Sequence, residues 1–162
     1  MPLEELALEL PNRPGTLAGV ARILAKERIN LAAISVDPSA RRGHVRLVVN
    51  HPARARALLS KAGFTVEEHE LIAVRLEDRA GSFLRVLDVL ADAKVNVQSV
   101  AILVVKEGAQ SLVALSTSDL ARARKVLEAA GFLSEGAERL ISNADLLAAA
   151  PAIPSQSVGL LL

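Results

Sequence analysis

The sequence contains no cysteine, no tryptophan and no tyrosine, and phenylalanine occurs only three times in 162 residues. The lack of cysteine excludes disulfides, thiolate nucleophiles and cysteine-based metal centres. The scarcity of aromatic rings argues against a sheet that recognises RNA by stacking bases. Neither sign of charge dominates, because 19 Lys and Arg are balanced by 18 Asp and Glu, so the chain as a whole offers no broad basic field for nucleic acid.

Long apolar runs and targeting features are also missing. No stretch of about 18 apolar residues is available to span a bilayer. The first residues include Glu4 and Glu5 where a secretory signal needs a basic start. We therefore expect a cytoplasmic protein that binds neither membrane nor nucleic acid. With 51% hydrophobic and 23% charged residues, the composition is that of a folded chain.

The sequence contains two copies of one repeat. Residues 6–10 resemble residues 72–76, at an offset of 66, and the similarity continues through the next turn and helix. Residues 53–56 match residues 121–124 at an offset of 68, so the second copy carries two extra residues. These fall between Val36 and Val45, where a hairpin turn tolerates insertion. We predict one repeat at 1–70, a second at 71–142, and a C-terminal helix and tail at 143–162.

Each copy reads strand, helix, strand, strand, helix, strand. Apolar residues alternate at positions 6, 8 and 10, as in a strand, and recur at 17, 20, 21 and 24, as in a helix. The second copy repeats these patterns, with a short last strand expected at 138–141. The order predicts an α+β fold of two tandem ferredoxin-like βαββαβ units, with antiparallel sheets and helices on one face.

The other face of each sheet is left uncovered by this arrangement. In the second strand, alternation places Ala32, Ile34 and Val36 on the face opposite Leu31 and Ala33. Uncovered faces and edges favour self-association. We therefore expect a homodimer or a higher homo-oligomer.

The turn after the first strand of each copy is the candidate site. It carries Gly15 or Gly81 just before a helix, where free N–H groups favour an anion such as a carboxylate. Glycine also lets a ligand approach the backbone closely. Asn30 and Asn96 open the second strand and offer both an amide donor and an acceptor. Together these groups suit an α-amino acid, which presents a carboxylate and an ammonium.

The same residues have a purely structural explanation. Asn12 and Asp78 are good helix caps, the two glycines would permit tight packing, and the two asparagines would finish turns. Other constellations are weaker. His44, His51 and His69 lack metal-ligand spacing, so we expect no metal, and neither a nucleophile elbow nor a phosphate loop is present.

The motif Asn12-x-Pro14-Gly15-x-Leu17, followed by an amphipathic helix and Ile29-Asn30-Leu31, resembles the ACT domain. This family of βαββαβ modules forms the regulatory part of amino-acid metabolic enzymes, and the resemblance covers residues 3–142. It implies units that pair side by side and bind an amino acid at their interface, without a catalytic residue or cofactor. The ligand-binding residues that it implies are Asn12, Pro14, Gly15, Thr16, Leu17 and Asn30 in the first copy, and Asp78, Ala80, Gly81, Ser82, Phe83 and Asn96 in the second.

The second copy departs from the motif at Asp78 and Ala80. An acid at 78 would repel a carboxylate and attract an ammonium, which leaves open whether both copies bind the same ligand. The resemblance extends to free-standing tandem ACT proteins and implies a non-catalytic sensor. One alternative is a dissociable regulatory subunit of an amino-acid biosynthetic enzyme, of the acetolactate synthase small-subunit kind. Another is an acylphosphatase-like enzyme, for which Arg13 and Arg79 are present but the glycine-rich phosphate cradle is not.

Overall fold

A computed structural model describes residues 3–38, 42–107, 110–134 and 136–142. The predicted C-terminal helix and tail at 143–162 lie outside these residues. The elements, in chain order, are β1 (Leu3–Pro11), α1 (Thr16–Lys26), β2 (Leu31–Pro38), β3 (Arg42–Val49), α2 (Pro52–Lys61), β4 (Val66–Leu76), α3 (Ser82–Asp92), β5 (Val97–Glu107), β6 (Gln110–Thr117), α4 (Leu120–Ala129) and α5 (Ala137–Ser142). The predicted tandem ferredoxin-like fold is confirmed. None of the described helices is long and apolar enough to cross a membrane.

The strands follow the order β2-β3-β1-β4-β6-β5, and all neighbouring pairs are antiparallel. β4 belongs to both units. Its first half, up to Leu71, pairs with β1, and its second half, from Ile72, pairs with β6. The last strand of the first unit and the first strand of the second unit are therefore one continuous strand, and no linker separates the units.

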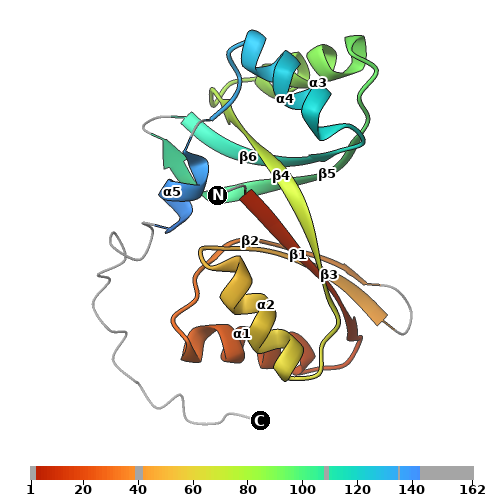
Figure 1. The fold of residues 1–162 in the computed structure, drawn as a ribbon, viewed down its shortest axis with the longest axis vertical. Helices are drawn as coiled ribbons and strands as arrows, with labels where there is room; N and C mark the ends of the chain where they lie inside the picture. Colours follow the sequence, from red (N-terminus) through yellow and green to blue (C-terminus); the bar gives the residue numbers. More distant parts are fainter. Residues whose placement is uncertain (1–2, 39–41, 108–109, 135, 143–162) are drawn as a thin grey trace.

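The two sheets turn their helix-free faces toward each other, so the layers run helix, sheet, sheet, helix (Figure 1). Each unit packs its own helices on the outer face of its sheet around a separate apolar cluster. A third cluster lies between the sheets and consists of Leu3, Ala32, Ala33, Val48, Leu71, Ala73, Leu103, Leu112, Ala114, Ala137 and Ile141. The sheet faces expected to be free for self-association thus cover one another, in part, within a single chain.

The register of β2 differs from the prediction. A bulge between Leu31 and Ala33 interrupts the alternation of side chains. Ala32 and Ala33 are both buried between the sheets, whereas Ile34 and Val36 lie on the helix-bearing face. The predicted grouping of Ala32 with Ile34 and Val36 is wrong, because one extra residue in a strand moves every later side chain to the opposite face.

The strands at the two sheet edges expose apolar side chains. β5 has a register shift near its start, as β2 does, and Val100, Ile102 and Val104 alternate along its exposed part, where Val104 is 82% exposed. Ile34 and Val36 in β2 are 49% and 46% exposed. Such an edge is a surface on which another strand can pair. The expectation of self-association therefore rests on the edges of the sheets instead of their faces.

The short strand predicted at 138–141 is wrong. These residues belong to α5, which follows Gly136 in the left-handed conformation, with φ of 86°. The last strand of the second unit is reduced to one bridge between Leu133 and Val74. Ala137 and Ile141 are one helical turn apart and pack into the cluster between the sheets, so the period of this apolar pattern is that of a helix.

One carboxyl group, that of Glu5 in β1, is buried at the border of the cluster between the sheets and is only 3% exposed. Burial raises the pKa of Glu5, although the charges of Arg46 and His69 lower it in part. A raised pKa means that the folded state binds the proton more tightly than the unfolded state, so stability is lost as pH rises through the raised value. We expect Glu5→Gln to unfold at a higher temperature than the wild type at pH 7. The difference should disappear at pH 4, and thermal melts at both pH values would check it; a less stable variant at pH 7 would contradict it.

Candidate functional site

The two predicted turns share one hydrogen-bonded geometry. In the first unit the N–H of Arg13 donates to the carbonyl of Pro11 at 2.8 Å, and the N–H of Thr16 donates to the carbonyl of Arg13 at 3.3 Å. The N–H groups of Arg79 and Ser82 make the corresponding bonds in the second unit, at the same two distances. The turns are therefore built alike, despite the different residues at positions 78 and 80.

Gly15 and Gly81 end these turns as the N-cap residues of α1 and α3. Their φ angles, 87° and 84°, lie in the left-handed region that glycine adopts without steric cost. No atom lies within 4 Å of the place that a Cβ would take at either residue, so the backbone conformation requires glycine and tight packing does not. The N-cap residues are these glycines, which have no side chain to cap a helix, so the alternative in which Asn12 and Asp78 take the N-cap positions is wrong.

Most of the twelve predicted residues are accessible. Asn12, Pro14, Gly15, Leu17, Asn30, Asp78, Ala80, Gly81 and Asn96 are exposed, Thr16 and Phe83 are half-buried, and Ser82 is buried. The Ser82 hydroxyl has no hydrogen-bond partner among the described residues. An unsatisfied buried hydroxyl costs about 1–3 kcal/mol, so a bound molecule or a paired unit that supplied a partner would relieve that cost.

Asn30 and Asn96 lie at the far end of the helices from these turns. The N–H of Asn30 donates to Oδ1 of Asn50 at 3.0 Å, and the N–H of Asn50 donates to the Asn30 carbonyl at 3.2 Å. Ser118 holds Asn96 in the same way. These bonds use backbone groups of the two asparagines. Because α1 has 11 residues, or about 16 Å at 1.5 Å per residue, Gly15 and Asn30 of one unit cannot touch the same amino acid.

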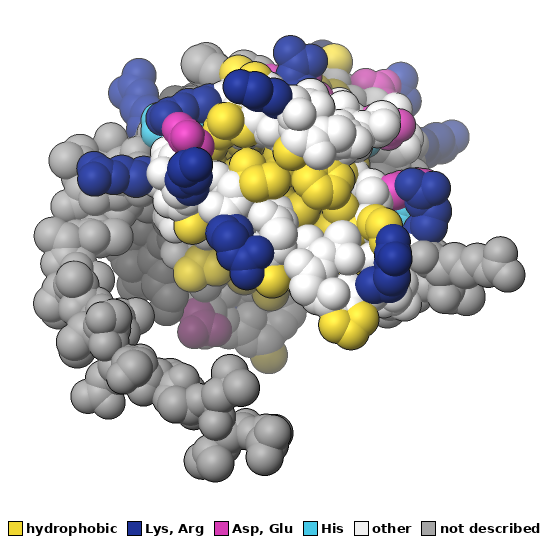
Figure 2. Space-filling model, turned by 90° about the horizontal axis from the view of Figure 1, so that it is seen from below, with side chains coloured by type: hydrophobic (Ala, Val, Ile, Leu, Met, Phe, Trp, Pro, Cys, Tyr) yellow, Lys and Arg dark blue, Asp and Glu magenta, His cyan; other side chains and the backbone are white. Residues whose placement is uncertain are grey.

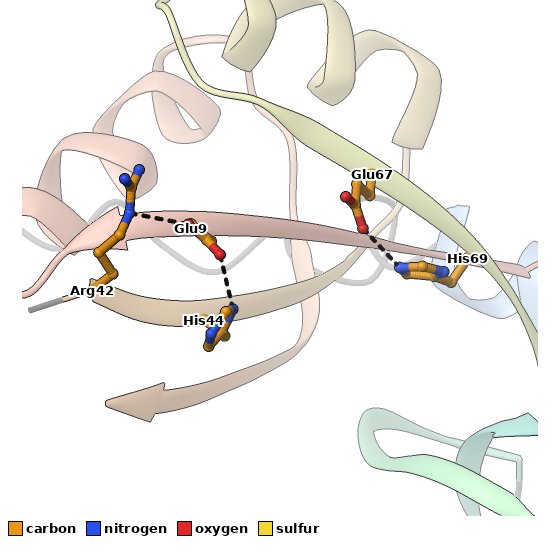
Figure 3. A network of polar contacts seen from close by, with 5 residues as sticks. All are labelled: Glu9, Arg42, His44, Glu67 and His69. Carbon is orange, nitrogen blue, oxygen red and sulfur yellow. Dashed lines mark ion pairs between the residues drawn. The ribbon is translucent and has the colours of Figure 1, made fainter. Parts of the chain in front are cut away.

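A cavity of about 610 Å³ opens on the helix-free face of the first sheet, and none of the twelve predicted residues lines it. Figure 3 shows its charged lining from three neighbouring strands. Nε of Arg42 lies 3.0 Å from Oε2 of Glu9, and Nδ1 of His44 lies 3.7 Å from Oε1 of the same residue. Nε2 of His69 lies 3.7 Å from Oε2 of Glu67.

These five side chains are between 47% and 72% exposed, and each carboxylate already has a cationic or imidazole neighbour. Exposed pairs of this kind contribute about 0–1 kcal/mol. In the part of the chain that the structure describes, no three His, Asp or Glu residues converge as metal ligands would. Sequence reasoning placed the histidines one at a time and missed this network, because its members come from three strands that are far apart in the sequence.

A family model for an ACT domain pair matches residues 1–141 of the chain. The chain belongs to the ACT domain pair family. No curated protein sequence matches it.

Three solved structures resemble this ACT domain pair. Protein BT0572 from Bacteroides thetaiotaomicron has a TM-score of 0.76 and 25% identity, over 82% of this chain and 91% of that one. The regulatory subunit of aspartate kinase from Thermus thermophilus has a TM-score of 0.60 and 17% identity, over 80% and 91%. The corresponding subunit from Thermus flavus has a TM-score of 0.56 and 16% identity, over 81% and 94%. The last two likenesses concern the fold alone.

The strand order determines which strand edges of this ACT domain pair are available for pairing with another chain. β2 and β5 stand at the two ends of the order and are not hydrogen-bonded to each other. Within the described residues, the outer edge of each strand therefore keeps its backbone N–H and C=O groups for another chain. The helix-free faces already meet inside the chain, and the two edge strands do not pair with each other, so side-by-side pairing at these edges would involve another chain.

Proposed function

We propose that this ACT domain pair is a non-catalytic regulatory sensor that binds an amino acid between units of two paired copies. The observation that carries the proposal is the pair of helix starts at Gly15 and Gly81, where the N-cap residue has no side chain to cap α1 or α3 and leaves open space beside the backbone. The carboxylate of an amino acid suits these positions, because helix N-termini favour anions. By contrast, α4 is capped internally, since the Asp119 carboxylate accepts a hydrogen bond from the N–H of Arg122 at 2.9 Å.

A second unit would complete the site. Gly15 lies at the end of the unit where β1 finishes, and Asn30 lies at the opposite end, where β2 begins. Antiparallel pairing of two edge strands sets the start of one beside the finish of the other. Asn30 of one unit would then approach the turn of its partner and offer its side-chain carbonyl to the ligand ammonium. Ile34 and Val36 would be buried by the same pairing.

A thermal-shift panel of the twenty amino acids tests the proposal. A ligand that binds only the folded state adds about 2.7 kcal/mol at a hundredfold excess over Kd, which for a chain of this length raises the unfolding temperature by roughly 5–10 °C. We expect one amino acid, or a few chemically related ones, to give this shift. No shift with any amino acid would contradict the sensor. A stably co-purifying biosynthetic enzyme would favour the dissociable regulatory subunit instead.

Asn30→Ala is expected to weaken binding of the identified amino acid at least tenfold without unfolding the protein. A hydrogen bond to a charged group contributes about 1.5–3 kcal/mol, whereas the bonds that hold this residue use its backbone. Isothermal titration calorimetry measures the affinity. Asn50→Ala is the matched control: Asn50 is 4% exposed and accepts from the Asn30 N–H, so its loss should lower stability by about 1–3 kcal/mol. If Asn30→Ala binds the amino acid as tightly as the wild type, the Asn30 side chain does not contact the ligand, which contradicts this part of the proposal.

A further inference from the structure

The helical layer of the first unit is strongly basic, although the chain as a whole is nearly neutral. Segments 12–30 and 51–65 hold α1, α2 and their turns, and they contain seven Lys and Arg but one acid, Glu27. The corresponding segments of the second unit, 78–96 and 119–133, contain six Lys and Arg and five Asp and Glu. The even overall balance therefore conceals a local excess of positive charge on one face.

Four cations, Arg22, Lys26, Arg54 and Lys61, define what we call the basic helical face. Arg22 and Lys26 are exposed and lie one turn apart on α1, and Arg54 and Lys61 are exposed and lie two turns apart on α2. Figure 2 looks onto this layer and shows Lys and Arg side chains around an apolar centre. Of the four, Arg54 alone has an acidic partner among the described residues, Oε2 of Glu27 at 2.6 Å.

The apolar part of the basic helical face consists mostly of small side chains, beside Leu17 at the start of α1, which is 37% exposed. Ala18, Ala21 and Ala25 are exposed on α1, and Ala53 and Ala57 are exposed on α2. Small side chains let the ridge of another helix approach closely. The alanines are too short to insert into a bilayer as Trp, Phe and Leu do, and Leu17 is the one exposed large apolar side chain among the described residues of α1 and α2. The phosphates of duplex nucleic acid offer these apolar side chains no partner.

The second unit shows that the fold does not require these cations. The positions of Arg22 and Lys26 on α1 are occupied by Asp88 and Asp92 on α3. On α4, Arg122 takes the position of Arg54, and its Nε lies 3.5 Å from Oδ2 of Asp119. In the first unit both helices are basic, and like charges on adjacent helices repel. This excess of positive charge opposes folding. A partner that supplies negative charge would explain why the first unit carries it.

We propose that the basic helical face docks an acidic amphipathic helix of another protein. The apolar stripe of that helix lies against the exposed alanines, and its Asp and Glu flanks meet Arg22, Lys26, Arg54 and Lys61. The 11 residues of α1 and 10 of α2 give a docking length of about 15 Å, or about three helical turns. This inference is independent of amino-acid binding at the turns and adds a protein partner to the proposed sensor.

The test uses the full chain and a fluorescein-labelled synthetic peptide of about five helical turns, with Leu and Ala on one side and Glu on both flanks. Fluorescence anisotropy should show binding at least tenfold tighter than that of a scrambled peptide of equal composition. Arg22→Asp with Lys26→Asp copies the second unit and should weaken binding at least tenfold while the unfolding temperature stays or rises. The matched control, Arg122→Asp with Lys125→Asp, makes the same charge change on α4 and should alter binding less than about threefold.

Equal binding of the scrambled peptide, or equal loss in the control variant, would reduce the effect to non-specific charge attraction and overturn the proposal. Tighter binding of a duplex DNA or of phosphatidylglycerol vesicles would also overturn it, because the face would then suit nucleic acid or lipid. If Arg22→Asp with Lys26→Asp leaves the peptide affinity unchanged, the proposal is likewise overturned. If that protein does not fold, as judged by circular dichroism, Arg22→Gln with Lys26→Gln provides the same comparison with a smaller charge change.

Discussion

Ala114→Glu is expected to lower the unfolding temperature by about 10 °C or more, or to prevent folding. Ala114 in β6 is completely buried between the two sheets, and it pairs with Ala73 in β4 and Ala101 in β5. A glutamate there would carry an uncompensated charge between two apolar faces, which costs about 3–5 kcal/mol. A chain of this length loses about 2–4 °C per kcal/mol. Differential scanning calorimetry measures the change.

Ala129→Glu is the matched control, because Ala129 is exposed at the end of α4 and surface substitutions usually change stability by less than about 0.5 kcal/mol. Since β4 crosses both units and one cluster joins their sheets, the wild type should unfold in a single transition. An Ala114→Glu protein as stable as the wild type would mean that the sheets do not pack face to face in solution.

Ile34→Lys combined with Ile102→Lys is expected to dissociate paired copies into single chains and to abolish the stabilisation by amino acid. Ile34 is 49% exposed in β2 and Ile102 is 72% exposed in β5, both on edge strands. Lysine on an edge strand is a common device against strand pairing, and burying it without an acid is costly. Sedimentation velocity across a concentration series should show at least a tenfold weaker association.

Leu84→Lys is the control for the edge substitutions, because Leu84 is 58% exposed on α3 and not on an edge strand. It should leave both the assembly and the ligand response unchanged. A wild type that stays monomeric at every concentration would contradict pairing at the edges. If the edge variant is monomeric but still responds to the amino acid, the site lies within one chain and the composite site is wrong.

The tandem fold was predictable because two copies of each pattern support one another, and hydrophobic periodicity is strongest in repeated elements. The face-to-face packing of the sheets also left a signal. Residues 112–115 in β6 are apolar without alternation, which indicates a strand buried on both faces. The side on which Ile34 lies was not predictable, since a bulge of one residue leaves no mark in the hydrophobic pattern. The run that ends at Ile141 was ambiguous because it is too short to separate the helical period from that of a strand.

For the candidate site, the sequence indicated which residues adopt the turn but not how far apart they lie. Gly15 and Asn30 belong to one motif, yet they stand at opposite ends of α1 because the chain must cross the sheet between β1 and β2. The basic helical face was hidden for a different reason. Net charge is a sum over the chain, and the acids that offset Arg22 and Lys26 are located in other layers of the structure.

The shared strand β4 sets a limit on how this protein can change length over evolution. The second copy carries two residues more than the segment between Val36 and Val45, and they lie not in the hairpin turn, as predicted, but in β5, where the register against β6 shifts between Ile102 and Lys106. A residue inserted near Leu71 in β4 could not be accommodated in this way. Every side chain of the second half of β4 would change faces, and Ile72 and Val74 would leave the core around α3 and α4 while Ala73 entered it. We therefore expect β4 to accept substitutions in descendants of this chain but to keep its 11 residues.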